Sequence, residues 1–169
     1  AEFMQLSNLE KLNLSDNHEL SGLSGDIKNL SRLKKLEIRF CNLKELPQEI
    51  MEITTLEHLD ISGNTIEELP RGIGKFASLN FFNVSSNNLT ALPETLEHCR
   101  ELRFLDISEN KFSKLPEGIT RLSSLQHLNC AANQTEELPE SLGELQNLDY
   151  LNIADMGLSG LPESIGKIR

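Results

Sequence analysis

Residues 56–78 read LEHLDISGNTIEELPRGIGKFAS, and the same arrangement of apolar and polar residues returns along the whole chain. The clearest marker is proline. Each of the six prolines follows a leucine, from Leu46-Pro47 to Leu161-Pro162, and successive prolines are 23 residues apart. A fixed period of roughly 20 to 50 residues indicates stacked structural units. We therefore predict one domain over residues 1–169, with about seven repeats that start near residues 9, 33, 56, 79, 102, 125 and 148.

The spacing of apolar residues predicts the local structure of a repeat. From each start, apolar residues follow at offsets 3, 5, 10, 13, 17 and 20. Alternation at offsets 3 and 5 indicates a short strand with one apolar face. Proline at offset 14 indicates a short helical or 3₁₀ segment, with the proline at its first helical position. Stacking these units buries their apolar edges and gives an α/β solenoid, with a parallel sheet on one side and short helices on the other.

One polar residue occupies a position that faces the predicted core. Asparagine stands at offset 8 in most repeats, at Asn17, Asn64, Asn87, Asn110 and Asn133. A buried amide must form hydrogen bonds, and the turn after the strand offers free backbone groups for them. We expect these side chains to bond that turn.

These positions together spell L-x-x-L-x-L-x-x-N-x-L in nearly every repeat, and in this the chain resembles the leucine-rich repeat family over residues 9–168. The 23-residue form with Leu-Pro is similar to intracellular Ras-group scaffolds, their plant relatives and leucine-rich repeat effectors of bacterial pathogens. The resemblance implies a curved solenoid whose concave sheet binds another macromolecule.

Some positions depart from the pattern. Cys41 and Met156 occupy the asparagine site, Thr135 replaces the apolar residue at offset 10, and Ser24 stands where proline is expected. Residues 1–3 resemble a cloning scar, and we expect the chain to be a fragment of a longer protein. These irregularities argue against a designed consensus sequence.

Composition excludes several kinds of partner. The net charge of −10 argues against nucleic acid, whose binding begins with neutralisation of phosphate by Lys and Arg. No apolar run approaches the roughly 18 residues of a membrane span, so we expect no membrane insertion. The three cysteines lie in different repeats and nothing in the sequence requires an oxidising compartment. We expect an intracellular monomer, and a host-delivered bacterial effector is one form of this expectation.

The side chains that alternate with the core leucines should point to the concave face. Their offset-2 column carries a run of rings, namely His58, Phe81, Phe104, His127 and Tyr150. Exposed rings in a contiguous patch are typical of binding hot spots. The alternative is that the rings only stabilise the sheet through cross-strand pairs.

Other candidate contacts flank this column. They are Phe40, Arg39, Asp60, Asp106 and Asp155. The alternative for Asp60 and Asp106 is that an acid or amide at offset 4 serves the sheet itself. Concave charges sum to +1 in the first two repeats and −3 in the last three, a gradient that would orient a partner.

The sequence shows no catalytic, cofactor or metal site. His58 and His127 lie three repeats apart, too far for one ion, and we interpret them as contact residues. The first functional hypothesis is a protein-binding module with no enzyme activity. The alternative is a targeting domain of a bacterial effector or multidomain enzyme, and a third is a structural spacer.

Overall fold

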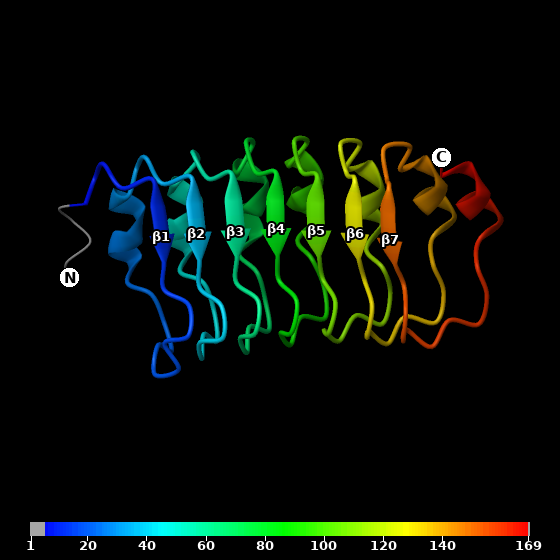
Figure 1. Ribbon diagram of the computed structural model, residues 1–169, viewed down its shortest axis with the longest axis horizontal. Helices are drawn as coiled ribbons and strands as arrows, with labels where there is room; N and C mark the ends of the chain where they lie inside the picture. Colours follow the sequence, from blue (N-terminus) through cyan, green and yellow to red (C-terminus); the bar gives the residue numbers. More distant parts are fainter. Residues whose placement is uncertain (1–5, 169) are drawn as a thin grey trace.

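A computed structural model describes residues 6–168, so the predicted cloning scar at residues 1–3 lies outside the described part. It contains one parallel sheet whose strands follow chain order without a crossover. The strands are β1 (Lys11–Asn13), β2 (Lys35–Glu37), β3 (His58–Asp60), β4 (Phe81–Asn83), β5 (Phe104–Asp106), β6 (His127–Asn129) and β7 (Tyr150–Asn152). They lie side by side in Figure 1. The predicted α/β solenoid of leucine-rich repeats is confirmed.

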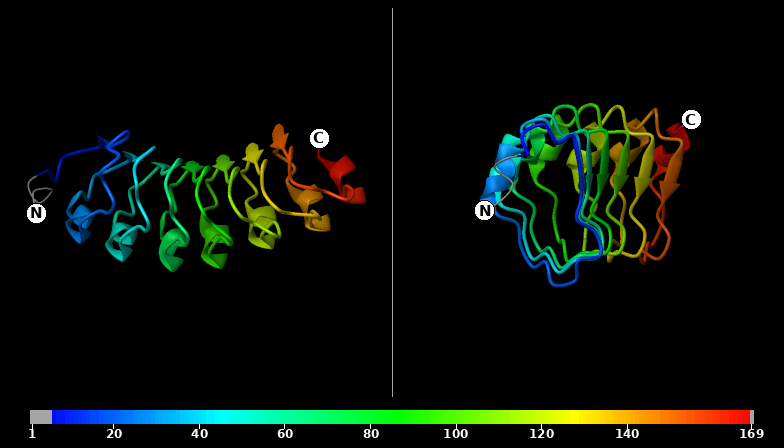
Figure 2. Two further views of the ribbon diagram at one scale, coloured as in Figure 1. Left: turned by 90° about the horizontal axis from the view of Figure 1, so that it is seen from below. Right: turned by 60° about the vertical axis from the view of Figure 1, so that its left-hand side comes forward.

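A short 3₁₀ helix returns the chain after each strand. The helices are η2 (Gly25–Asn29), η3 (Gln48–Glu52), η4 (Arg71–Lys75), η5 (Glu94–His98), η6 (Glu117–Arg121), η7 (Glu140–Glu144) and η8 (Glu163–Lys167). Figure 2 shows the helices spread more widely than the strands, so the sheet is the inner, concave side of the curve.

The start of these helices corrects one expectation. Each proline lies one residue before its helix, at the N-cap, because its backbone is extended, with ψ of 142° at Pro47 for example. The Pro47 carbonyl still accepts the first helical hydrogen bond, from the Ile50 amide at 3.1 Å. Ser24, the predicted exception, caps η2 with its side chain, which accepts from the Asp26 amide at 3.2 Å. Serine thus supplies a hydrogen bond where proline supplies a fixed φ.

The core is a stack of aliphatic columns between sheet and helices. Leu36, Leu59, Phe82, Leu105 and Leu128 form the column at offset 3, and all are fully buried. The irregular residues fit this core. Thr135 is buried and donates its hydroxyl to the Phe112 carbonyl at 3.0 Å, and Met156 is buried as a hydrophobe.

The buried asparagines bond the turn after their own strand, as predicted, and they also join that turn to the preceding repeat. The Nδ2 of Asn87 donates to the Ile61 and Val84 carbonyls, both at 3.0 Å, and its Oδ1 accepts from the Ile66 amide at 3.0 Å. Asn64, Asn110 and Asn133 repeat this arrangement. Cys41 replaces one of these hydrogen bonds to the preceding repeat, since its thiol donates to the Leu14 carbonyl at 3.3 Å.

A feature that the sequence did not reveal is a left-handed residue at offset 7 of every repeat. It is glycine only at Gly63. The other members are Asp16, Phe40, Ser86, Glu109, Ala132 and Asp155, with φ between 49° and 64°. The turn after each strand requires this conformation, which costs a non-glycine residue roughly 1–2 kcal/mol.

Ala132 and its neighbour Ala131 give a matched test of that cost. Ala132→Gly should raise the free energy of unfolding by about 0.5–1 kcal/mol, because glycine adopts φ of 53° without strain. Ala131→Gly should lower it by about 0.5–1 kcal/mol, because Ala131 has no positive φ to relieve and glycine only adds unfolded-state entropy. Urea unfolding curves check both values, and equal signs for the two variants would contradict the interpretation.

Candidate functional site: the concave face

The strand register places one side chain from each repeat in a column across the sheet. His58 pairs with Phe81, Phe81 with Phe104, Phe104 with His127, and His127 with Tyr150. All five predicted ring residues therefore lie next to one another on the concave face. We call them the ring ladder.

The ring ladder is a continuous stack. Successive ring centroids are 4.0, 4.3, 4.3 and 4.0 Å apart, and the planes are within 16° of parallel. Each pair contributes roughly 0.2–1 kcal/mol to the sheet, so the ladder stabilises the fold as well as forming a surface. Because the inner rings cover one another's faces, they present their edges to the concave surface.

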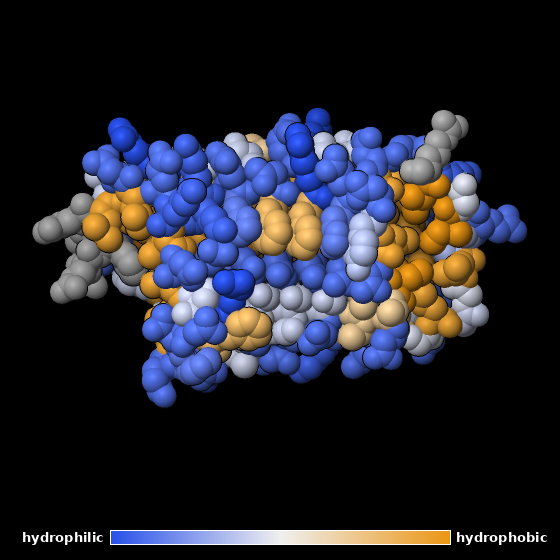
Figure 3. Space-filling view, viewed as in Figure 1, coloured by the Kyte–Doolittle hydropathy of each residue, from blue (hydrophilic) through white to orange (hydrophobic). Residues whose placement is uncertain are grey.

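The ladder stays accessible along its length. His58, Phe81, Phe104 and His127 are half-buried, and Tyr150 at the C-terminal end is 45% exposed. Figure 3 views this face and shows apolar groups near the centre of the sheet, surrounded by hydrophilic side chains. An apolar strip with a polar border is the usual composition of a protein-binding patch.

The two histidines of the ladder prefer the neutral form. Burial lowers the pKa of His58, and the nearby Lys35 ammonium adds to this effect, while Glu37 and Asp60 oppose it. Burial also lowers the pKa of His127, against the opposing charges of Asp106 and Asp149. At neutral pH both rings are therefore uncharged members of the stack.

The acidic residues that flank the ladder serve the turns after the strands. Asp60 is only 5% exposed, and its Oδ1 accepts from the Ser62 amide at 3.1 Å and the Ser62 hydroxyl at 2.7 Å. Asp106 makes the same pair of bonds with Ser108, at 2.9 and 2.6 Å. These contacts favour the alternative that offset 4 serves the sheet, and leave Asp155, which is exposed, as the freer carboxylate.

Phe40 and Arg39 lie at the N-terminal edge of the face. The Phe40 side chain is exposed, and its ring covers Gly63, where an added Cβ would come within 2.4 Å of Phe40 Cδ1. Glycine at 63 thus leaves room for the Phe40 ring, whereas the turn itself is formed by non-glycine residues in the other repeats. The Arg39 amide and Nε donate to the Ser15 hydroxyl, at 3.0 and 3.4 Å. Both residues adjoin the ladder without belonging to its stack.

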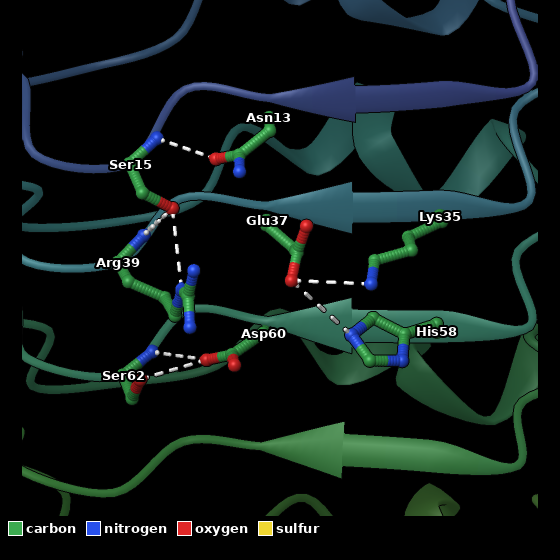
Figure 4. A network of polar contacts seen from close by, with 8 residues as sticks. All are labelled: Asn13, Ser15, Lys35, Glu37, Arg39, His58, Asp60 and Ser62. Carbon is green, nitrogen blue, oxygen red and sulfur yellow. Dashed lines mark hydrogen bonds and ion pairs between the residues drawn. The ribbon is translucent and has the colours of Figure 1, made fainter.

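A cluster that sequence reasoning missed lies at the N-terminal end of the ladder. Glu37, His58 and Asp60 each offer one ligand atom, and these atoms all lie within 4.8 Å of one another (Figure 4). From the sequence we paired His58 only with His127, whereas its neighbours in the structure are carboxylates, on the adjacent strand and on its own strand. The register itself, Glu37 against Asp60 and Lys35 against His58, was the signal that could have found the cluster.

The buried cysteines are held as thiols. Burial raises the pKa of Cys99 to about 11 and raises that of Cys130 as well. Since the thiolate is the reactive form, these two side chains act as small hydrophobes in the core at neutral pH.

Comparison with known proteins agrees with this geometry. The family model described as "Leucine-rich repeat region" matches residues 2–100 and 92–169. The chain therefore belongs to the leucine-rich repeat family. No curated protein matched the chain by sequence.

Several solved structures are similar over nearly the whole chain. A leucine-rich repeat protein of Leptospira interrogans shares 31% identity with a TM-score of 0.95, over 98% of this chain and 42% of that one. A TDR receptor shares 29% identity with a TM-score of 0.89, over 99% of this chain and 30% of that one.

The leucine-rich repeat ectodomain of the Arabidopsis thaliana membrane receptor kinase GASSHO1/SCHENGEN3, solved in complex with CASPARIAN STRIP INTEGRITY FACTOR 2, is also similar. It shares 29% identity with a TM-score of 0.85, over 94% of this chain and 22% of that one. The chain thus spans less than half the length of each of these three proteins. Of the helices within residues 6–168, none has the length and apolar character to cross a membrane.

The lowered pKa of His127 predicts how stability changes with pH. The unfolded chain has the ordinary pKa of 6.5, so below that value it binds a proton before the folded chain does, and the free energy of unfolding falls. Above pH 6.5 the contribution of the neutral ring is fully present.

His127→Phe keeps a ring in the stack and removes the titrating group. Between pH 7.5 and 5.5 the free energy of unfolding should fall less in this variant than in the wild type. Thermal melts followed by circular dichroism at both pH values check this, with a cooperative melt at pH 7.5 as the control. Equal falls in the two proteins would show that His127 does not couple folding to protons.

Proposed function

We propose that this chain is a protein-binding module that binds a polypeptide along the ring ladder of its concave face. The observation that carries the proposal is the unbroken stack of His58, Phe81, Phe104, His127 and Tyr150 on the concave face. Figure 3 shows apolar groups near the centre of this face with hydrophilic side chains beside them. Aromatic side chains bring large contact areas with few rotatable bonds, and they dominate the energy of many interfaces.

The shape of the face supports an elongated partner. The ladder crosses five strands, and a parallel sheet spaces them by about 4.8 Å, so the rings span roughly 20 Å. An extended segment of about six residues covers that length. The similar Arabidopsis ectodomain was solved in complex with CASPARIAN STRIP INTEGRITY FACTOR 2, which is consistent with a partner-binding use of the fold.

Charge gives the partner a direction. In the last three repeats the concave charges sum to −3, from Arg103 against Asp106, Glu109, Asp149 and Asp155. We propose a partner segment with apolar side chains for the rings and basic side chains toward these repeats. Such complementarity favours one orientation and a faster association.

The targeting-domain alternative uses the same face and adds a catalytic domain elsewhere in the gene. The coding sequence on either side of these residues distinguishes the two, because an adjoining catalytic domain supports only the alternative. We also propose an intracellular location, supported by three cysteines that are all free thiols in the structure.

A random 16-residue peptide library displayed on phage tests the proposed function without a known partner. Peptides selected on the wild-type chain should carry aromatic or aliphatic residues together with Lys or Arg. Phe81→Ala combined with Phe104→Ala should weaken a selected peptide by roughly 700-fold or more, since two hot-spot rings contribute at least about 2 kcal/mol each. Fluorescence anisotropy measures the affinity.

Leu161→Ala serves as the control, because Leu161 is exposed but follows the last strand. This variant should bind as the wild type does, and the double variant should keep its circular dichroism spectrum with a lower melting temperature. A folded double variant with unchanged affinity would refute binding along the ladder.

A further inference from the structure

Three different metal-ligand side chains meet at the N-terminal end of the ring ladder. His58 and Asp60 both come from β3, and Glu37 comes from β2 beside it. The His58 Nε2 is 3.9 Å from the Glu37 Oε1, and one ligand atom from each of the three residues lies within 4.8 Å of the others. Figure 4 shows the Glu37 carboxylate and the His58 ring turned toward one another.

His58 carries a second and independent sign of a ligand. Its Nε2 atom is buried and has no hydrogen-bond partner among the residues that the structure describes. A buried polar atom without a partner costs free energy, and such atoms in folded proteins call for an explanation. The ring cannot easily turn away, because it stacks on Phe81 at 4.0 Å with planes 8° from parallel.

The Asp60 carboxylate also has a fixed position. Its Oδ1 is fixed by the Ser62 amide and hydroxyl, so the carboxylate has one defined orientation. Within the described residues, both hydrogen bonds of this carboxylate are to Oδ1. An outer hydrogen bond that orients a ligating carboxylate is a regular feature of metal sites.

We propose that Glu37, His58 and Asp60 bind one Zn²⁺ ion on the concave face. An imidazole nitrogen with two carboxylates suits zinc, whereas Mg²⁺ and Ca²⁺ prefer oxygen ligands alone. Zinc bonds of about 2.0–2.2 Å place tetrahedral ligand atoms roughly 3.3–3.6 Å apart. The Glu37–His58 separation of 3.9 Å reaches that range by a small side-chain movement. Three protein ligands leave a coordination position for water or for a group of a bound partner.

Lys35 occupies the competing position. Its Nζ is 3.2 Å from the same Glu37 Oε1, and its side chain is 37% exposed. The ammonium neutralises Glu37 in the absence of metal and can move into solvent when the metal enters. The site therefore predicts a variant with increased affinity, Lys35→Met, which removes the competing cation.

The chain also holds an internal control. On η5, the Nε2 of His98 is again 3.9 Å from a glutamate oxygen, Glu97 Oε1, but His98 is 59% exposed. No third ligand completes that pair within residues 6–168, where Glu37, His58 and Asp60 form the one qualifying group. A His–Glu pair by itself should not hold the ion.

Isothermal titration of the metal-free chain with ZnCl₂ at pH 7.5 tests the site. We expect the wild-type chain to bind one Zn²⁺ ion. The affinity should fall at least tenfold in each of the variants Glu37→Gln, His58→Phe and Asp60→Asn. The control variant His98→Gln should bind Zn²⁺ with wild-type affinity. Each variant preserves shape: phenylalanine keeps the stack, and asparagine can still accept from Ser62. Lys35→Met should bind at least threefold more tightly. Visible absorption of the Co²⁺ complex should show a tetrahedral site that His58→Phe abolishes.

Binding that survives His58→Phe, equal weakening by His98→Gln, or an equal affinity for Mg²⁺ would each overturn the proposal. So would the absence of Zn²⁺ binding by a folded wild-type chain. The readout is metal binding alone, so its failure leaves peptide binding along the ladder unaffected, and the two proposals can fail separately.

Discussion

The buried asparagines form hydrogen bonds that hold neighbouring repeats in a fixed position relative to one another. The rest of the structure depends on these bonds. Each amide joins its own turn to the preceding repeat, as Asn110 does when it donates to Val84 and Ile107 and accepts from Leu89. These three backbone groups, one from its own turn and two from the preceding repeat, would otherwise lose these bonds, at roughly 1–3 kcal/mol each. These bonds favour a single register between neighbouring repeats. In this register, residues with the same offset lie side by side.

A fixed register turns the sequence into columns across the sheet. The columns that face the core are mostly aliphatic, and they accept other residue types whose volume and hydrogen bonding suit the site. Phe82, Cys130 and Thr135 are buried examples. The columns on the concave face do not pack into the core. A residue type that recurs there in successive repeats forms a continuous row across the sheet. The ring ladder arises in this way, and the same register brings Glu37 of β2 beside His58 and Asp60 of β3. The core residues and the proposed binding residues thus lie on opposite faces of the same short strands.

Spacing was enough to predict the strands, the 3₁₀ helices, the asparagine bonds and the ring column, because each follows from a residue type at a fixed offset. The left-handed turn at offset 7 escaped prediction, since only Gly63 among seven residues marks it and the tertiary stack forces the others. The roles of Asp60 and His58 also escaped, because burial and a side chain's rotamer depend on the neighbouring strand. Whether the ladder binds a partner is a matter of chemistry outside the chain, and the sequence could only nominate its residues.

The central claim is that recognition occurs at the ring ladder, and hydroxyl-radical footprinting of a chain–peptide complex tests it most directly. The method reports the solvent access of individual aromatic and aliphatic side chains. A bound peptide should slow oxidation of Phe81, Phe104 and Tyr150 several-fold and leave Leu161 unchanged, because these rings are accessible on the concave face and Leu161 follows the last strand. Protection of convex or terminal side chains, with unchanged oxidation of the three rings, would contradict the account.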